Sequence, residues 1–178
     1  MASKVYIIGC NYVKENSEVQ DNVEEKLIKR SILTGQDIDI QSLLGTELYE
    51  IVLSELYNFK HTGTTISTRI KTLVDDYIVP VLLYSVLRDV IPFILMRITP
   101  SSVSQNDNNT NSNQTEYKIV SLFRKEYETK YQHYANRLTF YLNENDTTFP
   151  EWSYMNTSGD RQSVAPKKDQ SYFGGIQL

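Results

Sequence analysis

The sequence predicts a mainly α fold: a four-helix-type bundle with a long antiparallel helical hairpin, a short extended segment at the N-terminus and an extended C-terminal tail. Two observations carry this prediction. Residues 115–143 contain no Gly or Pro and place apolar or aromatic residues at steps of three and four, which lines one face of a helix. Residues 77–98 are apolar nearly all round, as expected for the central helix of a bundle.

The chain is predicted to divide into three parts. An N-terminal extended arm covers residues 1–20, a helical domain covers residues 21–152, and a C-terminal docking tail covers residues 153–178. Within the arm, residues 5–10 are β-prone and short, so they suit an edge strand or an extended segment lying on a neighbour. Residues 11–20 are polar and are predicted to form a loop.

The helical domain is predicted to begin with two helices. Asp21 and Glu24 form a capping-box pattern at the start of the first helix. The apolar pattern of this helix continues toward Gly45, with a break expected near Gly35, and Gly45 is expected to be the C-cap. Thr46 then starts the second helix.

Two longer helices are predicted to follow. They cover residues 66–98 and 115–143, and the polar, Asn-rich residues 101–114 form the loop between them. Because one loop joins them, we expect these two helices to pack as an antiparallel hairpin. Pro80 and Pro92 each remove a helical hydrogen bond, so kinks or breaks are expected there.

Charge and composition argue against several classes of protein. The formal net charge of -4 is not that of a dedicated nucleic-acid binder, which normally has a basic surface. The single cysteine, Cys10, rules out an internal disulfide, and no signal peptide is visible. Residues 77–98 are long enough to span a membrane, but Arg88 and Asp89 lie at their centre. A buried bundle helix is therefore the better interpretation, and we expect no membrane partner.

No catalytic set can be assembled from the sequence. His61 and His133 are far apart, and neither has a second ligand at the spacing of a metal site. Cys10 has no basic neighbour that would activate it as a nucleophile. Dinucleotide-binding, phosphate-binding and nucleophile-elbow motifs do not occur. We therefore expect no catalytic residue, no cofactor and no metal ion, and predict that the protein is not an enzyme.

Arg88 and Asp89 are the candidate residues for a core or inter-subunit ion pair. Both charges are embedded in apolar sequence, and burying them unpaired would be costly. We expect them to be paired within the core or across a subunit contact. The alternative is simple exposure at a kink.

The tail is the candidate docking segment. It is polar, yet it ends with aromatic and aliphatic residues, which a solvated tail does not need and a segment that folds onto a partner does. A frayed terminus is the alternative. The candidate interface residues are Trp152, Tyr172, Phe173, Ile176 and Leu178.

Several segments of the helical domain resemble a known family. They are the stretch QDIDIQSLLGTELY at 36–49, the stretch LVDDYIVPVL at 73–82, YANRL at 134–138 and FPEW at 149–152. In this order they resemble the small helical head–tail connector (adaptor ring) proteins of tailed bacteriophages, most closely those of crAss-like phages of Bacteroides-type hosts. The likeness covers residues 11–152. The tail and the Asn-rich loop do not match the family.

The resemblance implies a structural virion protein. Such proteins form a ring, typically of twelve copies, beneath the portal protein; the ring extends the DNA channel and supports the next tail or ring protein. DNA then passes through the lumen without sequence-specific binding, and the protein resides at the head–tail junction of the virion after assembly in the bacterial cytoplasm. The alternative is a non-enzymatic helical regulatory or interaction protein of phage or bacterial origin.

Overall fold

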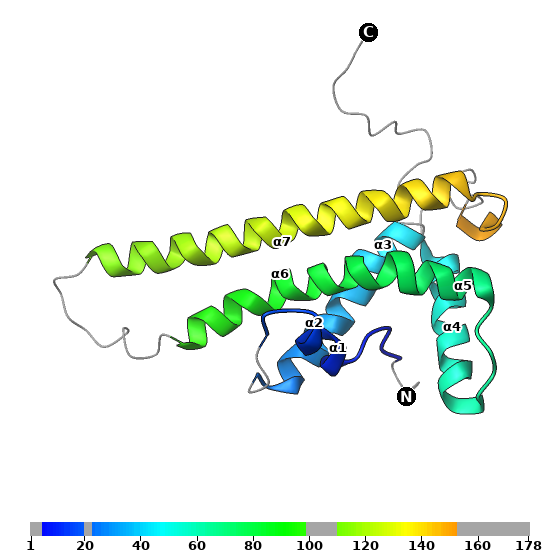
Figure 1. The fold of residues 1–178 in the computed structure, drawn as a ribbon, viewed down its shortest axis with the longest axis horizontal. Helices are drawn as coiled ribbons and strands as arrows, with labels where there is room; N and C mark the ends of the chain where they lie inside the picture. Colours follow the sequence, from blue (N-terminus) through cyan, green and yellow to red (C-terminus); the bar gives the residue numbers. More distant parts are fainter. Residues whose placement is uncertain (1–4, 20–22, 99–109, 153–178) are drawn as a thin grey trace, which may run out of the picture.

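The computed structural model describes residues 5–19, 23–98 and 110–152, and within these ranges the chain is mainly helical and contains no strand. The predicted all-α class is therefore confirmed (Figure 1). The elements in chain order are α1 (Cys10–Glu15), α2 (Glu25–Gly35), the π-helical segment η1 (Gln36–Ile40), α3 (Gln41–Leu44), α4 (Thr46–Thr62), α5 (Thr68–Thr72), the π-helical segment η2 (Leu73–Ile78), α6 (Val79–Ile98) and α7 (Thr110–Glu144).

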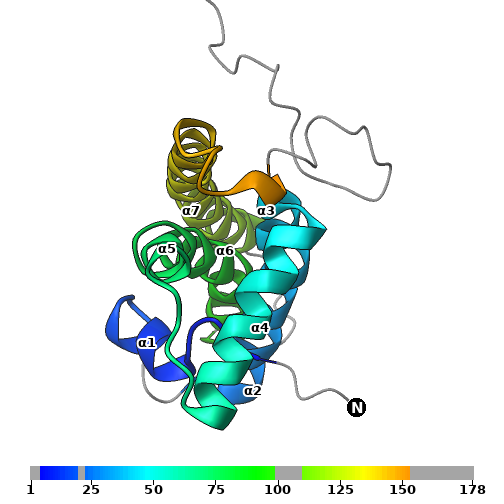
Figure 2. The same ribbon diagram turned by 90° about the vertical axis from the view of Figure 1, so that its right-hand side faces the viewer.

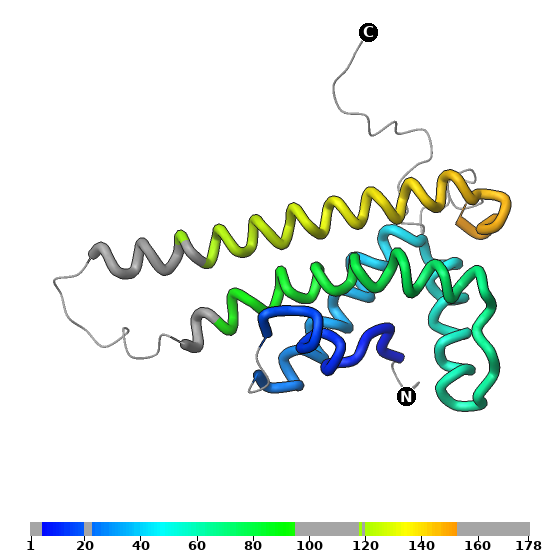
Figure 3. Tube along the Cα trace, in the orientation of Figure 1, coloured from blue at the N-terminus to red at the C-terminus, as the bar shows by residue number. Residues whose placement is uncertain are grey.

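The long helices α6 and α7 lie side by side and run in opposite directions, as the chain trace in Figure 3 shows. Stacked tyrosines hold α7 against η2 and α6: the ring centroids of Tyr77 in η2 and Tyr141 in α7 are 3.9 Å apart, and those of Tyr84 in α6 and Tyr134 in α7 are 5.2 Å apart. Tyr suits this position because its ring packs while its hydroxyl reaches water. At 1.5 Å per residue, the 35 residues of α7 give a rod about 52 Å long.

Helix α6 is the centre of the core. Its side chains Leu82, Val86, Leu87 and Val90 are almost completely buried. Helix α7 covers one side of α6, while α1 and α2 lie on the other side, as Figures 1 and 2 both show. The apolar face of α7 that was read from its three-and-four spacing is the face turned toward α6.

Gly35 does not break the first predicted helix, because the chain continues through η1 into α3 without leaving the helical region. Its role is close packing. A Cβ atom at this position would lie 2.7 Å from Oγ of Ser85 and 3.0 Å from Cδ1 of Leu82, so only glycine lets α2 approach α6 this closely. The break comes at Gly45, as predicted, where φ is 76°.

Neither proline interrupts the second long helical run, and the expectation of a break there is wrong. Pro92 lies inside α6. Pro80 follows η2, where the amide of Val79 donates to the carbonyl of Val74, five residues back. This wider turn relieves the clash that a proline ring makes with the carbonyl four residues before it.

Two predicted loops are partly helical. Residues 10–15 form α1, whose Val13 is fully buried, so tertiary packing rather than helix propensity orders this short segment. Helix α7 begins at Thr110, so residues 110–114 of the predicted Asn-rich loop belong to the helix. Helix α2 begins after Glu24, which makes no side-chain capping bond, and Asp21 lies outside the described residues.

Candidate functional site

Arg88 is the centre of an ion-pair network that joins three elements. Its guanidinium donates to Oδ2 of Asp39 in η1 at 2.8 Å and to Oε2 of Glu128 in α7 at 2.9 Å. The same guanidinium lies 4.5 Å above the ring of Tyr131. The side chains of Arg88 and Asp39 are 23% and 14% exposed, so both charges are largely removed from water. The charge embedded in α6 is thus paired within the chain.

Asp39 is the best-satisfied acid of this network. Besides Arg88, it accepts hydrogen bonds from the hydroxyl of Ser85 and, at 3.4 Å, from the hydroxyl of Tyr131. Burial and the nearby Asp39 carboxylate raise the pKa of Tyr131 to about 12. Burial alone would raise the pKa of Glu128, but hydrogen bonds from Gln132 and Arg88 outweigh it and lower that pKa.

Asp89 is not the partner of Arg88. Its carboxylate is on the surface and accepts a hydrogen bond from the hydroxyl of Ser31 in α2 at 2.6 Å. The two residues are adjacent on a helix, so their side chains point in different directions. Arg88 therefore pairs with Asp39 and Glu128, which come from other elements, whereas Asp89 bonds to Ser31.

An open groove of about 480 Å³ lies along this network, between α2 with η1 on one side and α6 with α7 on the other. Two large apolar side chains stand exposed in it: Ile38 at 63% and Phe93 at 47%. The residues lining the groove, hereafter the α2–α6 groove, are Ser31, Thr34, Gly35, Ile38, Asp39, Ser85, Arg88, Asp89, Pro92, Phe93, Arg124 and Glu128.

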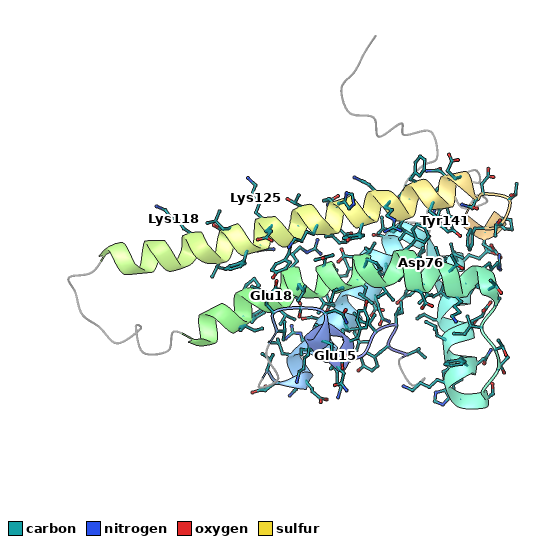
Figure 4. All side chains as sticks on the ribbon, in the orientation of Figure 1. Glu15, Glu18, Asp76, Lys118, Lys125 and Tyr141 are labelled. Carbon is teal, nitrogen blue, oxygen red and sulfur yellow. The ribbon has the colours of Figure 1, made fainter. Side chains whose placement is uncertain are left out.

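A second apolar surface lies on α7, away from α6. Leu122 is 66% exposed and Phe140 is 61% exposed. They are eighteen residues apart, which is five helical turns, so they point to the same side about 27 Å from each other. Lys118 and Lys125 also point away from α6 on this side (Figure 4). We call these four residues the α7 outer face.

The end of the described chain is folded onto its own core. Trp152 is 1% exposed, and its Nε1–H donates to the carbonyl of Leu43 at 3.1 Å. Next to it, the guanidinium of Arg69 pairs with Glu151 at 2.9 Å and donates to the carbonyl of Thr148 at 2.8 Å. Trp152 is therefore a core residue of its own chain rather than a free interface residue. The other candidate interface residues, Tyr172, Phe173, Ile176 and Leu178, lie outside the described residues.

The remaining candidate groups do not converge. His61 and His133 are both on the surface, in α4 and α7. Cys10 is buried, and burial raises the pKa of its thiol. Within residues 5–19, 23–98 and 110–152, no group of three or more His, Cys, Asp or Glu side chains is placed to hold a metal ion.

One helical run, Thr68–Ile94, is long and apolar enough to cross a membrane by length and composition alone. Half of its most apolar window is buried inside the molecule. Buried residues of this run, such as Leu82 and Leu87, belong to the hydrophobic core that the other helices share.

The fold and these surfaces define a mainly α protein with an internal ion-pair network and two partly apolar surfaces, the α2–α6 groove and the α7 outer face. The chain belongs to a family of unknown function, DUF6712, whose model matches residues 40–162. This match covers α3 to α7 and includes Arg88 and Glu128, whereas Asp39 lies one residue before it. Comparison with curated proteins gives no match, and comparison with solved structures gives none.

Sequence reasoning missed the two surfaces and both partners of Arg88. The α7 outer face had a signal in the sequence, because Leu122 and Phe140 fall opposite the three-and-four stripe of the same helix. The groove had no such signal, since Ile38 and Phe93 are distant in sequence and line one groove only because α2 and η1 pack on α6.

Proposed function

We propose that this protein is a head–tail connector subunit of a tailed bacteriophage, a structural virion protein that forms a ring beneath the portal protein. In this proposal the helices form a four-helix-type bundle with a long α6–α7 hairpin, and copies stand side by side around a DNA channel. The resemblance of residues 36–49, 73–82, 134–138 and 149–152 to connector proteins suggests the role.

The observation that carries the proposal is the exposure of large apolar side chains on a chain whose core is otherwise complete. Trp152, Phe149 and the buried face of α6 are covered by the chain's own helices. Leu122 and Phe140, in contrast, stand in water on one face of α7 although no part of the described fold needs them there. Large apolar side chains exposed on the same face of a long helix suit a protein–protein contact that runs along that helix.

The charge of the chain fits a channel wall. A formal net charge of -4 repels the DNA backbone, so a lumen made by many copies would let DNA slide rather than hold it. The partners of this role are further copies of the chain, twelve in the typical ring, the portal protein above and the next tail or ring protein below. Closed rings arise from head-to-tail contacts when the rotation between copies divides evenly into a full turn.

The proposal is tested by the mass of the purified chain, alone and mixed with the portal protein of the same genome, measured by light scattering and followed by negative-stain imaging. A ring of about twelve subunits, alone or on the portal, is the expected result. A monomer or dimer that ignores the portal would contradict it.

The second candidate is a helical regulatory or interaction protein without catalytic activity. The α2–α6 groove, with Ile38 and Phe93 exposed, favours it because such a groove can receive a segment of another protein. The same mass measurement separates the two: a regulatory protein stays a small oligomer whether or not the portal is present.

A further inference from the structure

We propose that the α7 outer face of one copy docks into the α2–α6 groove of the next copy, so that each chain contacts its two neighbours through different surfaces. This inference rests on the proposed function, because it names the two surfaces that a ring of this chain would use. Its occupant is a second copy of the chain and no other partner.

The two surfaces lie on different sides of the chain, as a head-to-tail contact requires. Leu122 belongs to the α7 outer face, and Arg124, two residues later, lines the groove. Two residues along an α-helix correspond to a rotation of about 200°, so their side chains point to nearly opposite sides of α7. One chain can therefore offer its outer face to one neighbour and its groove to another at the same time. Contacts of this kind propagate around a ring.

The apolar residues of the two surfaces complement each other. On the outer face, Leu122 and Phe140 project from a straight helix. In the groove, Ile38 and Phe93 are exposed beside Pro92. A helix laid into a groove buries the apolar side chains of one of its faces, which is a frequent mode of helix recognition. Aromatic side chains such as phenylalanine are enriched in protein–protein contacts.

Charge favours the same pairing. The groove is lined by three carboxylates and two guanidiniums, and Arg88 is already paired with both Asp39 and Glu128. The carboxylate of Asp89, which accepts a hydrogen bond from the neutral Ser31 hydroxyl, adds a negative charge at the groove surface.

The opposing charge is on the outer face. Lys118 and Lys125 are exposed and point away from α6 (Figure 4). The acid that follows Lys125 is Glu126, whose carboxylate is held by Lys130 at 2.6 Å, one turn further along. The outer face therefore carries two lysines, whereas the three carboxylates and two guanidiniums of the groove leave it a net charge of -1. This difference in sign favours contact of an outer face with a groove over contact between two outer faces.

The test uses two variants of the full chain. The outer-face variant carries Leu122→Asp and Phe140→Asp, and the groove variant carries Ile38→Asp and Phe93→Asp. All four side chains are exposed, so the circular dichroism spectrum and the melting temperature should stay close to those of the unmodified chain. The control is Phe59→Asp, which changes a phenylalanine that is 55% exposed on α4, away from both surfaces.

The expected result is specific to a contact between unlike surfaces. Each variant alone is monomeric at concentrations where the unmodified chain and the Phe59→Asp control assemble. When the two variants are mixed, one intact outer face meets one intact groove, so they form a one-to-one pair of twice the subunit mass and nothing larger. If the chain assembles only on the portal protein, the same variants are compared by the number of their subunits that bind to each portal ring.

Other outcomes overturn the inference. If either variant alone assembles as the unmodified chain does, its surface is not part of the contact. If both variants are monomeric but their mixture gives no pair, the contact is not between the outer face and the groove. In each of these cases rings of the unmodified chain still support the proposed function. If the unmodified chain forms no assembly, alone or with the portal, the proposed function fails together with the inference.

Discussion

Replacing Arg88 with methionine should lower the free energy of unfolding by about 3 kcal/mol. Methionine keeps much of the volume of the side chain but removes its charge and its donors. The bond to Asp39, whose side chain is 14% exposed, counts most, because hydrogen bonds to charged groups contribute about 1.5–3 kcal/mol. The pair with Glu128 adds about 0.5 kcal/mol, since that carboxylate is 41% exposed and screened by water. The contact with Tyr131 adds about 0.5–1 kcal/mol.

The assay is urea unfolding at neutral pH, followed by circular dichroism. A loss of about 3 kcal/mol corresponds to a fall in melting temperature of roughly 6–12 °C for a chain of this size. Arg124→Met is the matched control, because Arg124 lines the same groove but is exposed; we expect it to change stability by less than about 0.5 kcal/mol.

A second substitution tests the cause of the loss. In the Arg88→Met background, Asp39→Asn should recover part of the stability, because it removes the carboxylate that the first change leaves unpaired. The reasoning is refuted if Arg88→Met costs no more than Arg124→Met. It is also refuted if Asp39→Asn lowers the free energy of unfolding of the Arg88→Met variant by as much as it lowers that of the unmodified chain.

Three further predictions follow from the packing, the titration and the tail. Trp152→Ala should lower the free energy of unfolding by about 3–5 kcal/mol in the same assay, since the indole is 1% exposed. A decrease below about 1 kcal/mol would show that Trp152 is not part of the core. The pKa of Tyr131 is raised to about 12, above its ordinary value of 10.0, so its contribution to stability should be constant below pH 10 and be lost as the pH rises from 10 toward 12. Tyr131→Phe should reduce the alkaline fall in stability, to which Tyr49 and Tyr127 also contribute because burial raises their pKa values; an unchanged fall would show that Tyr131 does not contribute to it. Deleting residues 170–178 should leave the circular dichroism spectrum unchanged but weaken assembly with the portal protein, and equal assembly of the truncated and full chains would refute a docking role for the tail.

The helices could be predicted from the sequence where their signal is local. The apolar stripe of α7 repeats over many turns, and Gly45 marks a helix end because its φ of 76° suits only glycine. Helix α1 could not be predicted, since it has only six residues, half of them polar, and only Cys10 and Val13 are buried. Its order comes from contacts with α2, which no pattern within six residues can reveal.

The candidate site was predictable only in part, for the same reason. A charge embedded in apolar residues indicated that Arg88 must be paired. Its partners, Asp39 and Glu128, lie 49 and 40 residues away, so their identity depends on how three helices pack. Trp152 was predicted to be an interface residue because a large aromatic residue next to a polar tail is typical of a docking anchor. In the structure it packs onto its own chain.

The two π-helical segments have a consequence for how the chain tolerates changes in length. A π turn holds one residue more than the α turn it replaces, so it is the trace of a single inserted residue inside a helix. Removing one residue from η1 should therefore restore a regular α-helix and keep α3 and Gly45 in register. The same deletion in the middle of α6 would rotate every later side chain by about 100° and turn its buried face into water. A single-residue deletion in this chain is thus expected to be tolerated at η1 rather than in α6.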